Sequence, residues 1–190
     1  EALRREWLGE DEGPLIGFVG ALVDHKAPWV LADAAPLIRR ELPGARVVFI
    51  GEGELRPVLE ERMNKDPRAI LLPGWRSDIA DCYAALDMFV MPSKLEGLCT
   101  ALIDALGVGV PAVASEAGGI PDVVKHGETG VLVPPESPEA LAAAVVDLWR
   151  DEEQRRRFSK AGKEHVAQHF TAEAMVQGTM RVYEEMKTEK

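Results

Sequence analysis

Six short runs of apolar residues recur along the chain, and each has the length of one β-strand. They occupy residues 14–20, 46–51, 69–74, 87–92, 111–115 and 130–135. Within each run the apolar residues are nearly continuous instead of alternating with polar ones. This pattern is typical of strands that are buried on both faces of a sheet.

Segments with helical character separate and follow the six runs. They cover about 28–42, 53–64, 77–85, 97–107 and 118–125, and three more helices are expected from residue 137 onward. Parallel strands need crossover connections, which are almost always right-handed helices. We therefore predict an α/β fold: a Rossmann-like doubly wound parallel sheet of about six strands with helices on both faces. In such folds ligands bind at the carboxyl ends of the strands.

Composition narrows the choice of partners. The 190 residues are 46% hydrophobic, which is enough for one soluble globular domain with a substantial core. A net charge of -10 disfavours nucleic acid and anionic membranes as main partners. No apolar run is long enough to span a bilayer and no secretory signal is present, so we expect a cytoplasmic protein. Any phosphate site must be locally positive, built from a few Lys or Arg residues and helix N-termini.

Cysteine and histidine give no metal pattern. Cys82 and Cys99 are too few for a disulfide framework and lack metal-ligand spacing, so we expect reduced thiols. His165 and His169 are four residues apart in a predicted helix, but no third ligand is near in sequence. We predict no metal site.

The segment from 93 to 106 places acidic residues around a predicted helix start. Glu96 lies at the helix entrance and Asp104 lies inside the helix, on the same side as Thr100. An apolar arc is expected to face the sheet, formed by Leu98, Ala101, Leu102, Ala105 and Leu106. On these residues alone, Glu96 could be a simple helix cap and Asp104 a solvated surface residue.

Longer motifs carry a resemblance to a known family. The stretches "VGALVDHKAP" (19–28) and "GWRSDIADCYAALDMFVMPSKLEGLCTALIDALGVGVPAVASEAGGIPDVVKHGETGVLVPP" (74–135), in this order, resemble the C-terminal domain of a family 4 (group 1) glycosyltransferase of the GT-B fold. The similarity covers about residues 14–186. It implies a connector from a missing N-terminal domain at 1–13, a nucleotide-sugar-binding domain at 14–170 and a C-terminal helix at 171–190. Residue 1 is Glu and not Met, which agrees with a missing half.

The resemblance also assigns roles to residues. Glu96 matches the first acid of the family's Glu-x7-Glu motif, which contacts donor-sugar hydroxyls, and Asp104 replaces the second Glu, which contacts the ribose. Lys26 matches the lysine that binds the diphosphate. Many relatives carry Arg after the first glycine, where this chain has Ala21; His25 and Arg76 are candidates for that missing charge. The implied donor-binding set is Gly20, Ala21, Lys26, Trp75, Arg76, Glu96, Gly97, Leu98, Cys99, Thr100 and Asp104, with Lys26 and Glu96 as catalytic residues.

By this resemblance we expect the donor-binding half of a retaining glycosyltransferase of glycan biosynthesis. It would transfer a sugar from a nucleotide-sugar, with a UDP-sugar as first guess, to an acceptor that the sequence does not identify. No cofactor or metal is expected, and any membrane contact would come through the missing domain. We expect this half alone to be inactive without its N-terminal acceptor domain. Two alternatives stay open: a sugar-nucleotide epimerase of the same fold, and a non-catalytic nucleotide-binding module.

Overall fold

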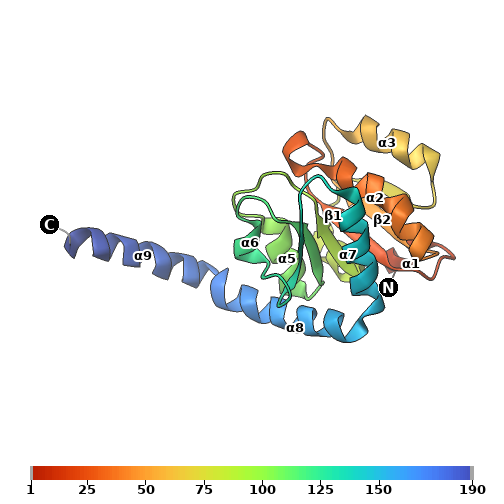
Figure 1. Ribbon diagram of the computed structural model, residues 1–190. Coiled ribbons are helices and arrows are strands. Elements are labelled where there is room, and N and C mark those ends of the chain that lie inside the picture. Colours follow the sequence, from red (N-terminus) through yellow and green to blue (C-terminus); the bar gives the residue numbers. More distant parts are fainter. Residues whose placement is uncertain (1, 189–190) are drawn as a thin grey trace.

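The computed structural model, which describes residues 2–188, is built around one six-stranded sheet (Figure 1). The strands are β1 (Leu15–Val19), β2 (Arg46–Ile50), β3 (Ile70–Gly74), β4 (Met88–Met91), β5 (Ala112–Ser115) and β6 (Gly130–Val133). All neighbouring strands pair in parallel, in the order β3-β2-β1-β4-β5-β6. Each of the six apolar runs forms one strand, and the predicted doubly wound parallel sheet is confirmed.

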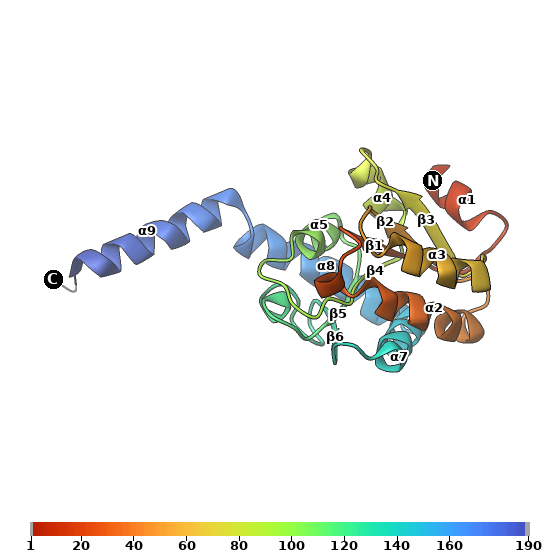
Figure 2. The same ribbon diagram turned by 90° about the horizontal axis from the view of Figure 1, so that it is seen from above.

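Helices cover both faces of this sheet. The crossover and flanking helices are α1 (Ala2–Leu8), α2 (Pro28–Glu41), α3 (Arg56–Lys65), α4 (Ile79–Ala85), α5 (Thr100–Val108), α6 (Ile120–Val123), α7 (Pro138–Arg150), α8 (Glu152–His169) and α9 (Ala172–Thr188). Helix α2 packs against α3 and α7 on one face, whereas α5 packs against α4 and α8 on the other (Figure 2). The connections from β1 and from β4 leave toward opposite faces, so the strand order reverses between these two strands, which is where open α/β sheets bind ligands.

The strands are held between two apolar layers. Phe18, Phe49 and Phe89 are fully buried side chains of β1, β2 and β4. The rings of Phe18 and Phe49 are 5.8 Å apart, so neighbouring strands share one aromatic cluster. This core fixes the carboxyl ends of β1, β2 and β4, from which the polar loops of the site begin.

The first residues form a helix that packs on the domain. In α1 the side chain of Trp7 is only 1% exposed, and Arg4 makes an ion pair with Asp87, just before β4. The resemblance predicts only a connector over residues 1–13, whereas Ala2–Leu8 form this helix. The division of the chain into domains remains a prediction.

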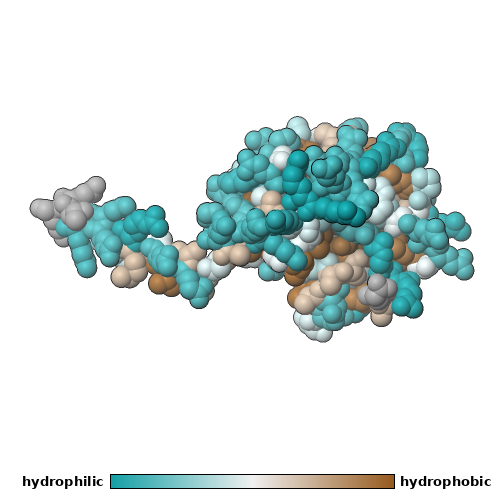
Figure 3. Space-filling view, turned by 90° about the horizontal axis from the view of Figure 1, so that it is seen from below, coloured by the Kyte–Doolittle hydropathy of each residue, from teal (hydrophilic) through white to brown (hydrophobic). Residues whose placement is uncertain are grey.

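The last helix, unlike α1, extends away from the domain. Helix α9 leaves the domain at the end of α8 and projects away from it (Figure 1). Figure 3 shows hydrophobic residues along the projecting helix. The exposed large apolar side chains of α9 are Met175, Val176, Met180, Val182, Tyr183 and Met186. Between residues 2 and 188 no helix has both the length and the apolar character that a bilayer crossing requires.

Candidate functional site

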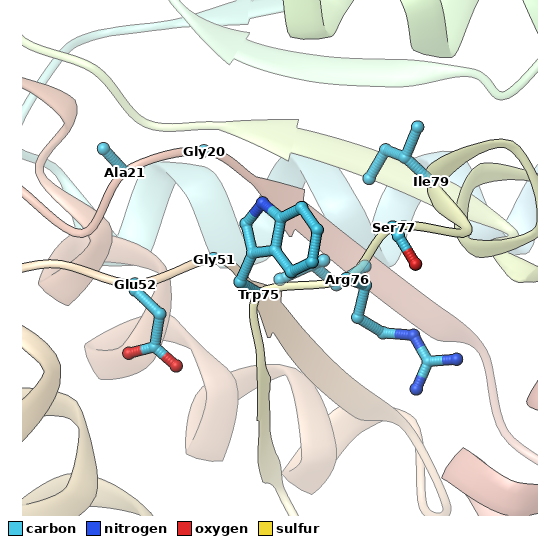
Figure 4. A pocket seen from close by; sticks show the side chains of 9 residues that line it. Gly20, Ala21, Gly51, Glu52, Trp75, Arg76, Ser77 and Ile79 are labelled. Carbon is cyan, nitrogen blue, oxygen red and sulfur yellow. The ribbon is translucent and has the colours of Figure 1, made fainter.

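A hollow of about 620 Å³ lies at the carboxyl ends of β1, β2 and β3 (Figure 4). Its walls come from the loops that follow these three strands, and they are formed by Gly20, Ala21, Ile50, Gly51, Glu52, Trp75, Arg76, Ser77 and Ile79. The loops after β1 and β2 run against each other without side chains between them, since a Cβ on Gly51 would lie 2.0 Å from the carbonyl oxygen of Gly20. Glycine at position 51 therefore serves close approach of two backbones.

Trp75 and Arg76 both line this hollow but face different ways. The indole of Trp75 is 73% exposed and stands over the hollow, whereas the guanidinium of Arg76 points away from Gly20 and Ala21 (Figure 4). Arg76 donates two hydrogen bonds to the carboxylate of Asp78, and this contact lowers the pKa of Asp78. The positive charge of Arg76 is thus already paired, and Trp75 offers a flat apolar surface to a ligand.

Lys26 and Glu96 meet beyond the carboxyl ends of β1 and β4. They are 70 residues apart in sequence, yet Nζ of Lys26 lies 2.6 Å from Oε1 of Glu96. Both side chains are shielded, with 18% of Lys26 and 9% of Glu96 exposed. The loops that carry them are joined by the backbone as well, because the amide of Lys94 donates to the carbonyl of His25. Two loops from neighbouring strands therefore hold one charged pair in a fixed position.

The backbone of Glu96 is fixed from a third loop, which follows β5. The amide of Gly119 donates to the carbonyl oxygen of Glu96 over 2.9 Å. A Cβ on Gly118 would lie 2.2 Å from that same oxygen, and one on Gly119 would lie 2.0 Å from the carbonyl oxygen of Gly97. The Gly118–Gly119 pair is needed because any side chain at these two positions would displace the loop that carries Glu96.

Glu96 does not cap helix α5. The helix begins at Thr100, three residues later than the predicted start at 97, with Cys99 at the N-cap position and no side-chain capping bond. The carboxylate of Glu96 instead accepts hydrogen bonds from Lys26 and from the hydroxyl of Ser93. The alternative of a simple cap is therefore wrong.

One member of the predicted apolar arc is also misplaced. Leu102, Ala105 and Leu106 are buried as expected, but Leu98 is 59% exposed. Leu98 precedes the first turn of the helix, so the helical periodicity does not extend to it. Its exposure places an apolar side chain at the surface beside the N-terminus of α5.

Asp104 lies on the exposed side of α5, as does Thr100. Its carboxylate makes no hydrogen bond or ion pair within residues 2–188, and partial burial raises the pKa of Asp104 above its ordinary value. Tyr83 of α4 donates from its hydroxyl to the carbonyl of Ala101 in the same helix. Asp104 thus stands ready as an acceptor that the protein itself does not use.

Cys82 and Cys99 are free and buried. Burial raises the pKa of the Cys99 thiol to about 11, so this thiol stays protonated at neutral pH. Cys99 is therefore a packed neighbour of Glu96 rather than a nucleophile.

Within residues 2–188 no group of three or more His, Cys, Asp or Glu side chains is arranged to hold a metal ion. The rings of His165 and His169 are 4.8 Å apart, and His165 lies beside the carbonyl of Asp122. His126 accepts a hydrogen bond from the amide of Leu132 in the turn before β6.

Ser93 and the Gly118–Gly119 pair are not among the site residues predicted from the sequence. The hydroxyl of Ser93 is fully buried and lies 2.9 Å from Oε1 of Glu96. A serine three residues before a candidate acid is too common to be a signal. The double glycine is a signal that can be recognised in the sequence, because adjacent glycines after a strand indicate a close backbone approach.

Comparison with known proteins identifies the family of the chain. The sequence profile of the glycosyl transferases group 1 family matches residues 13–151. The chain belongs to this family. It is 33% identical over 164 residues to sulfoquinovosyl transferase SQD2 of Arabidopsis thaliana, covering 85% of this chain and 31% of that protein. It is 31% identical over 177 residues to a GDP-mannose-dependent alpha-(1-6)-phosphatidylinositol monomannoside mannosyltransferase of Mycobacterium tuberculosis, covering 87% of this chain and 46% of that protein.

The fold is also similar to that of solved structures. Anabaena Alr3699/HepE in complex with UDP superimposes with a TM-score of 0.84 at 22% identity, over 98% of this chain and 52% of that chain. The chain therefore spans about half or less of the length of these three proteins. The GT-B glycosyltransferase fold expected from the sequence is confirmed for this part.

Proposed function

We propose that this chain is the donor-binding half of a retaining glycosyltransferase that takes a sugar from a nucleotide-sugar. The observation that carries the proposal is the Lys26–Glu96 pair beyond the carboxyl ends of β1 and β4, 2.6 Å apart and largely shielded from solvent. A cation for a diphosphate and an acid for hydroxyl groups are thus brought together at the place where open α/β sheets bind ligands.

Lys26 would serve the diphosphate. Its ammonium can stabilise the negative charge that develops on the leaving phosphate as the glycosidic bond breaks. The N-terminus of α5 adds to this, since the amides of Gly97, Leu98 and Cys99 donate to no acceptor within residues 2–188 and unpaired amides before a helix attract anions. Together they supply local positive potential on a chain whose net charge is -10.

The two acids would recognise different hydroxyl groups. Sugar hydroxyls donate to ionised carboxylates, and each such bond contributes roughly 1.5–3 kcal/mol. We assign Glu96 to the hexose and Asp104 to the ribose. Trp75, exposed over the hollow, provides a surface on which a nucleotide base could stack.

The base and sugar are open to a direct test. The structural relative from Anabaena was solved with UDP, which supports a UDP-sugar as first choice. A relative from Mycobacterium tuberculosis is named as GDP-mannose-dependent, which makes GDP-sugars the second choice. Family membership favours transfer over the epimerase alternative.

The rest of the proposal concerns the whole protein. We propose that an N-terminal domain outside this chain supplies the acceptor site and any membrane contact, that no metal is required, and that the enzyme works in the cytoplasm in glycan biosynthesis. The 190-residue chain alone should then bind donor but show little or no transfer, because the acceptor lacks a positioning surface.

A thermal-shift panel tests the binding. UDP, GDP, ADP and their sugar conjugates are added to the purified chain, and a ligand that binds only the folded state raises its unfolding temperature. One nucleotide series should raise the unfolding temperature of the chain. The same ligands should raise the unfolding temperature of the Lys26→Ala variant much less. If every nucleotide leaves the unfolding temperature unchanged, the donor-site proposal is wrong.

A further inference from the structure

The carboxylate of Glu96 is used unequally by the protein. Its Oε1 accepts two hydrogen bonds, from Nζ of Lys26 at 2.6 Å and from Oγ of Ser93 at 2.9 Å. Its Oε2 accepts none within residues 2–188, although only 9% of the Glu96 side chain is exposed. An ionised carboxylate has about four acceptor positions, and Oε2 of Glu96 is not among the side-chain atoms that are both buried and unpaired, so it can accept a hydrogen bond from a ligand.

Ser93 is well placed to set which oxygen is free. Ser93 lies two residues after the end of β4 and is fully buried, so its hydroxyl has no access to solvent. Ser93 lies on the same loop as Glu96, whereas Lys26 lies on the loop after β1. Two donors from different directions on one oxygen define the rotation of the carboxylate plane, which one donor alone would not.

We infer that Ser93 is a positioning residue that, together with Lys26, holds Oε1 of Glu96 and so presents Oε2 to a hydroxyl of the donor sugar. This inference rests on the proposed donor-binding function. Ser93 touches Glu96 and not the ligand, so its effect on binding passes through Glu96.

The role predicts a selective loss of affinity. Ser93→Ala should weaken binding of the sugar nucleotide roughly 3- to 10-fold, because the Glu96 carboxylate loses one of its two fixed donors. Binding of the matching nucleoside diphosphate should stay within about twofold, since that ligand carries no hexose to meet Oε2.

A matched control exists in the next strand. Ser115, at the end of β5, is 1% exposed, and its hydroxyl makes no hydrogen bond within residues 2–188. Ser115→Ala removes a buried hydroxyl of the same size without touching Glu96. It should leave both affinities unchanged, and thermal unfolding of each variant checks that the fold is intact.

A double-mutant cycle separates positioning through Glu96 from a direct or general effect. Calorimetry measures UDP-glucose against UDP, and GDP-mannose against GDP, with the unaltered chain, Ser93→Ala, Glu96→Gln and the double variant. If Ser93 acts through Glu96, Ser93→Ala causes no further loss in the Glu96→Gln background, whereas independent residues give additive losses.

The outcomes are distinct. Selective, non-additive loss for the sugar nucleotide supports the inference. Equal loss for both ligands, additive loss in the double variant, or no loss at all overturns it while leaving the donor site in place. Failure of every sugar nucleotide and nucleoside diphosphate to bind the unaltered chain would overturn the proposed function, and this inference with it.

Discussion

Glu96 and Asp104 are the same kind of side chain on either side of one helix start, yet the protein treats them in opposite ways. Glu96 is 9% exposed, has two donors on one oxygen and a backbone carbonyl bound by Gly119. Asp104 is exposed and has no partner within residues 2–188. One acid is held by the protein before any ligand arrives, and the other is left for the ligand to use.

This difference predicts whether a mutation changes the stability of the protein, its affinity for ligand, or both. A change in the contacts of Glu96 alters the folded protein as well as the site, because a shielded carboxylate loses a partner. A change of Asp104 removes no contact within the protein and mainly alters what a ligand meets. Mutations near Glu96 should therefore lower both the stability of the free chain and the affinity, whereas Asp104→Asn should lower the affinity without lowering the stability.

The largest effect is expected from Lys26→Ala. It leaves the shielded Glu96 carboxylate with Ser93 as its only side-chain donor, which should lower the free energy of unfolding by about 1–3 kcal/mol, between the values for surface and buried pairs. Affinity for nucleoside diphosphate should fall roughly 10- to 100-fold. Affinity for the bare nucleoside should fall less, because the proposed contact is with phosphate.

Lys94→Ala is the control for this prediction. Lys94 also pairs with an acid, but its partner Asp24 is 71% exposed, so the stability change should stay below about 1 kcal/mol. Denaturant unfolding and calorimetry measure both quantities. Equal loss of nucleoside and nucleoside diphosphate affinity in Lys26→Ala would mean that Lys26 acts indirectly.

A smaller effect is expected where the Glu96 backbone is supported. Gly118 has φ +54° and an added Cβ would meet the carbonyl oxygen of Glu96 at 2.2 Å, whereas Gly127 has φ +76° and open space around it. Gly127→Ala should cost only the backbone strain, about 1–2 kcal/mol of unfolding free energy. Gly118→Ala should cost more and should also weaken sugar-nucleotide binding, because Glu96 has to move. Identical behaviour of the two variants would show that the Gly118 contact does not position Glu96.

The smallest effect concerns pH. Partial burial raises the pKa of Asp104, so the folded chain binds this proton more tightly than the unfolded chain does. The Asp104 charge therefore disfavours folding above the raised pKa, and this cost disappears as the pH falls through it. Asp104→Asn should be slightly more stable than the unaltered chain at neutral pH and lose that advantage in acid.

Protonation of Asp104 should stabilise the fold but weaken nucleotide binding. Ribose hydroxyls prefer the ionised acceptor, so the nucleotide affinity of the unaltered chain should fall as Asp104 becomes protonated. Asp104→Asn should show weaker binding at neutral pH and no loss from this group on acidification. Parallel pH profiles for the two proteins would contradict a ribose contact by Asp104.

Much of this architecture follows from local patterns in the sequence. The apolar runs predict all six strands, since strands buried on both faces need continuous Val, Ile, Leu and Phe. Lys26, Glu96 and Asp104 stand out through their place in spaced motifs. The structure adds that Lys26 and Glu96 touch, which no spacing along the chain could show.

The misses share one physical cause, which is tertiary contact. Helix α5 starts later than its periodicity suggests because Glu96 and Gly97 are held by the loop after β5, so Leu98 falls outside the first turn. Trp7 is buried by packing of α1 on the domain, although the acidic run that follows it has the composition of a linker. Ser93 has no local signature, since its importance comes only from the oxygen that it contacts.

The central claim is that one ligand spans both acids, with its hexose at Glu96 and its ribose at Asp104. Calorimetry of Glu96→Gln and Asp104→Asn, each with the sugar nucleotide that stabilises the unaltered chain and with the corresponding nucleoside diphosphate, tests it through four affinities. Glu96→Gln should weaken the sugar nucleotide roughly 10-fold or more and leave the diphosphate nearly unchanged, or slightly stronger because Lys26 is released, whereas Asp104→Asn should weaken both ligands by similar factors. Equal weakening of the two ligands by Glu96→Gln, or no change in either with Asp104→Asn, would contradict this assignment of the two acids.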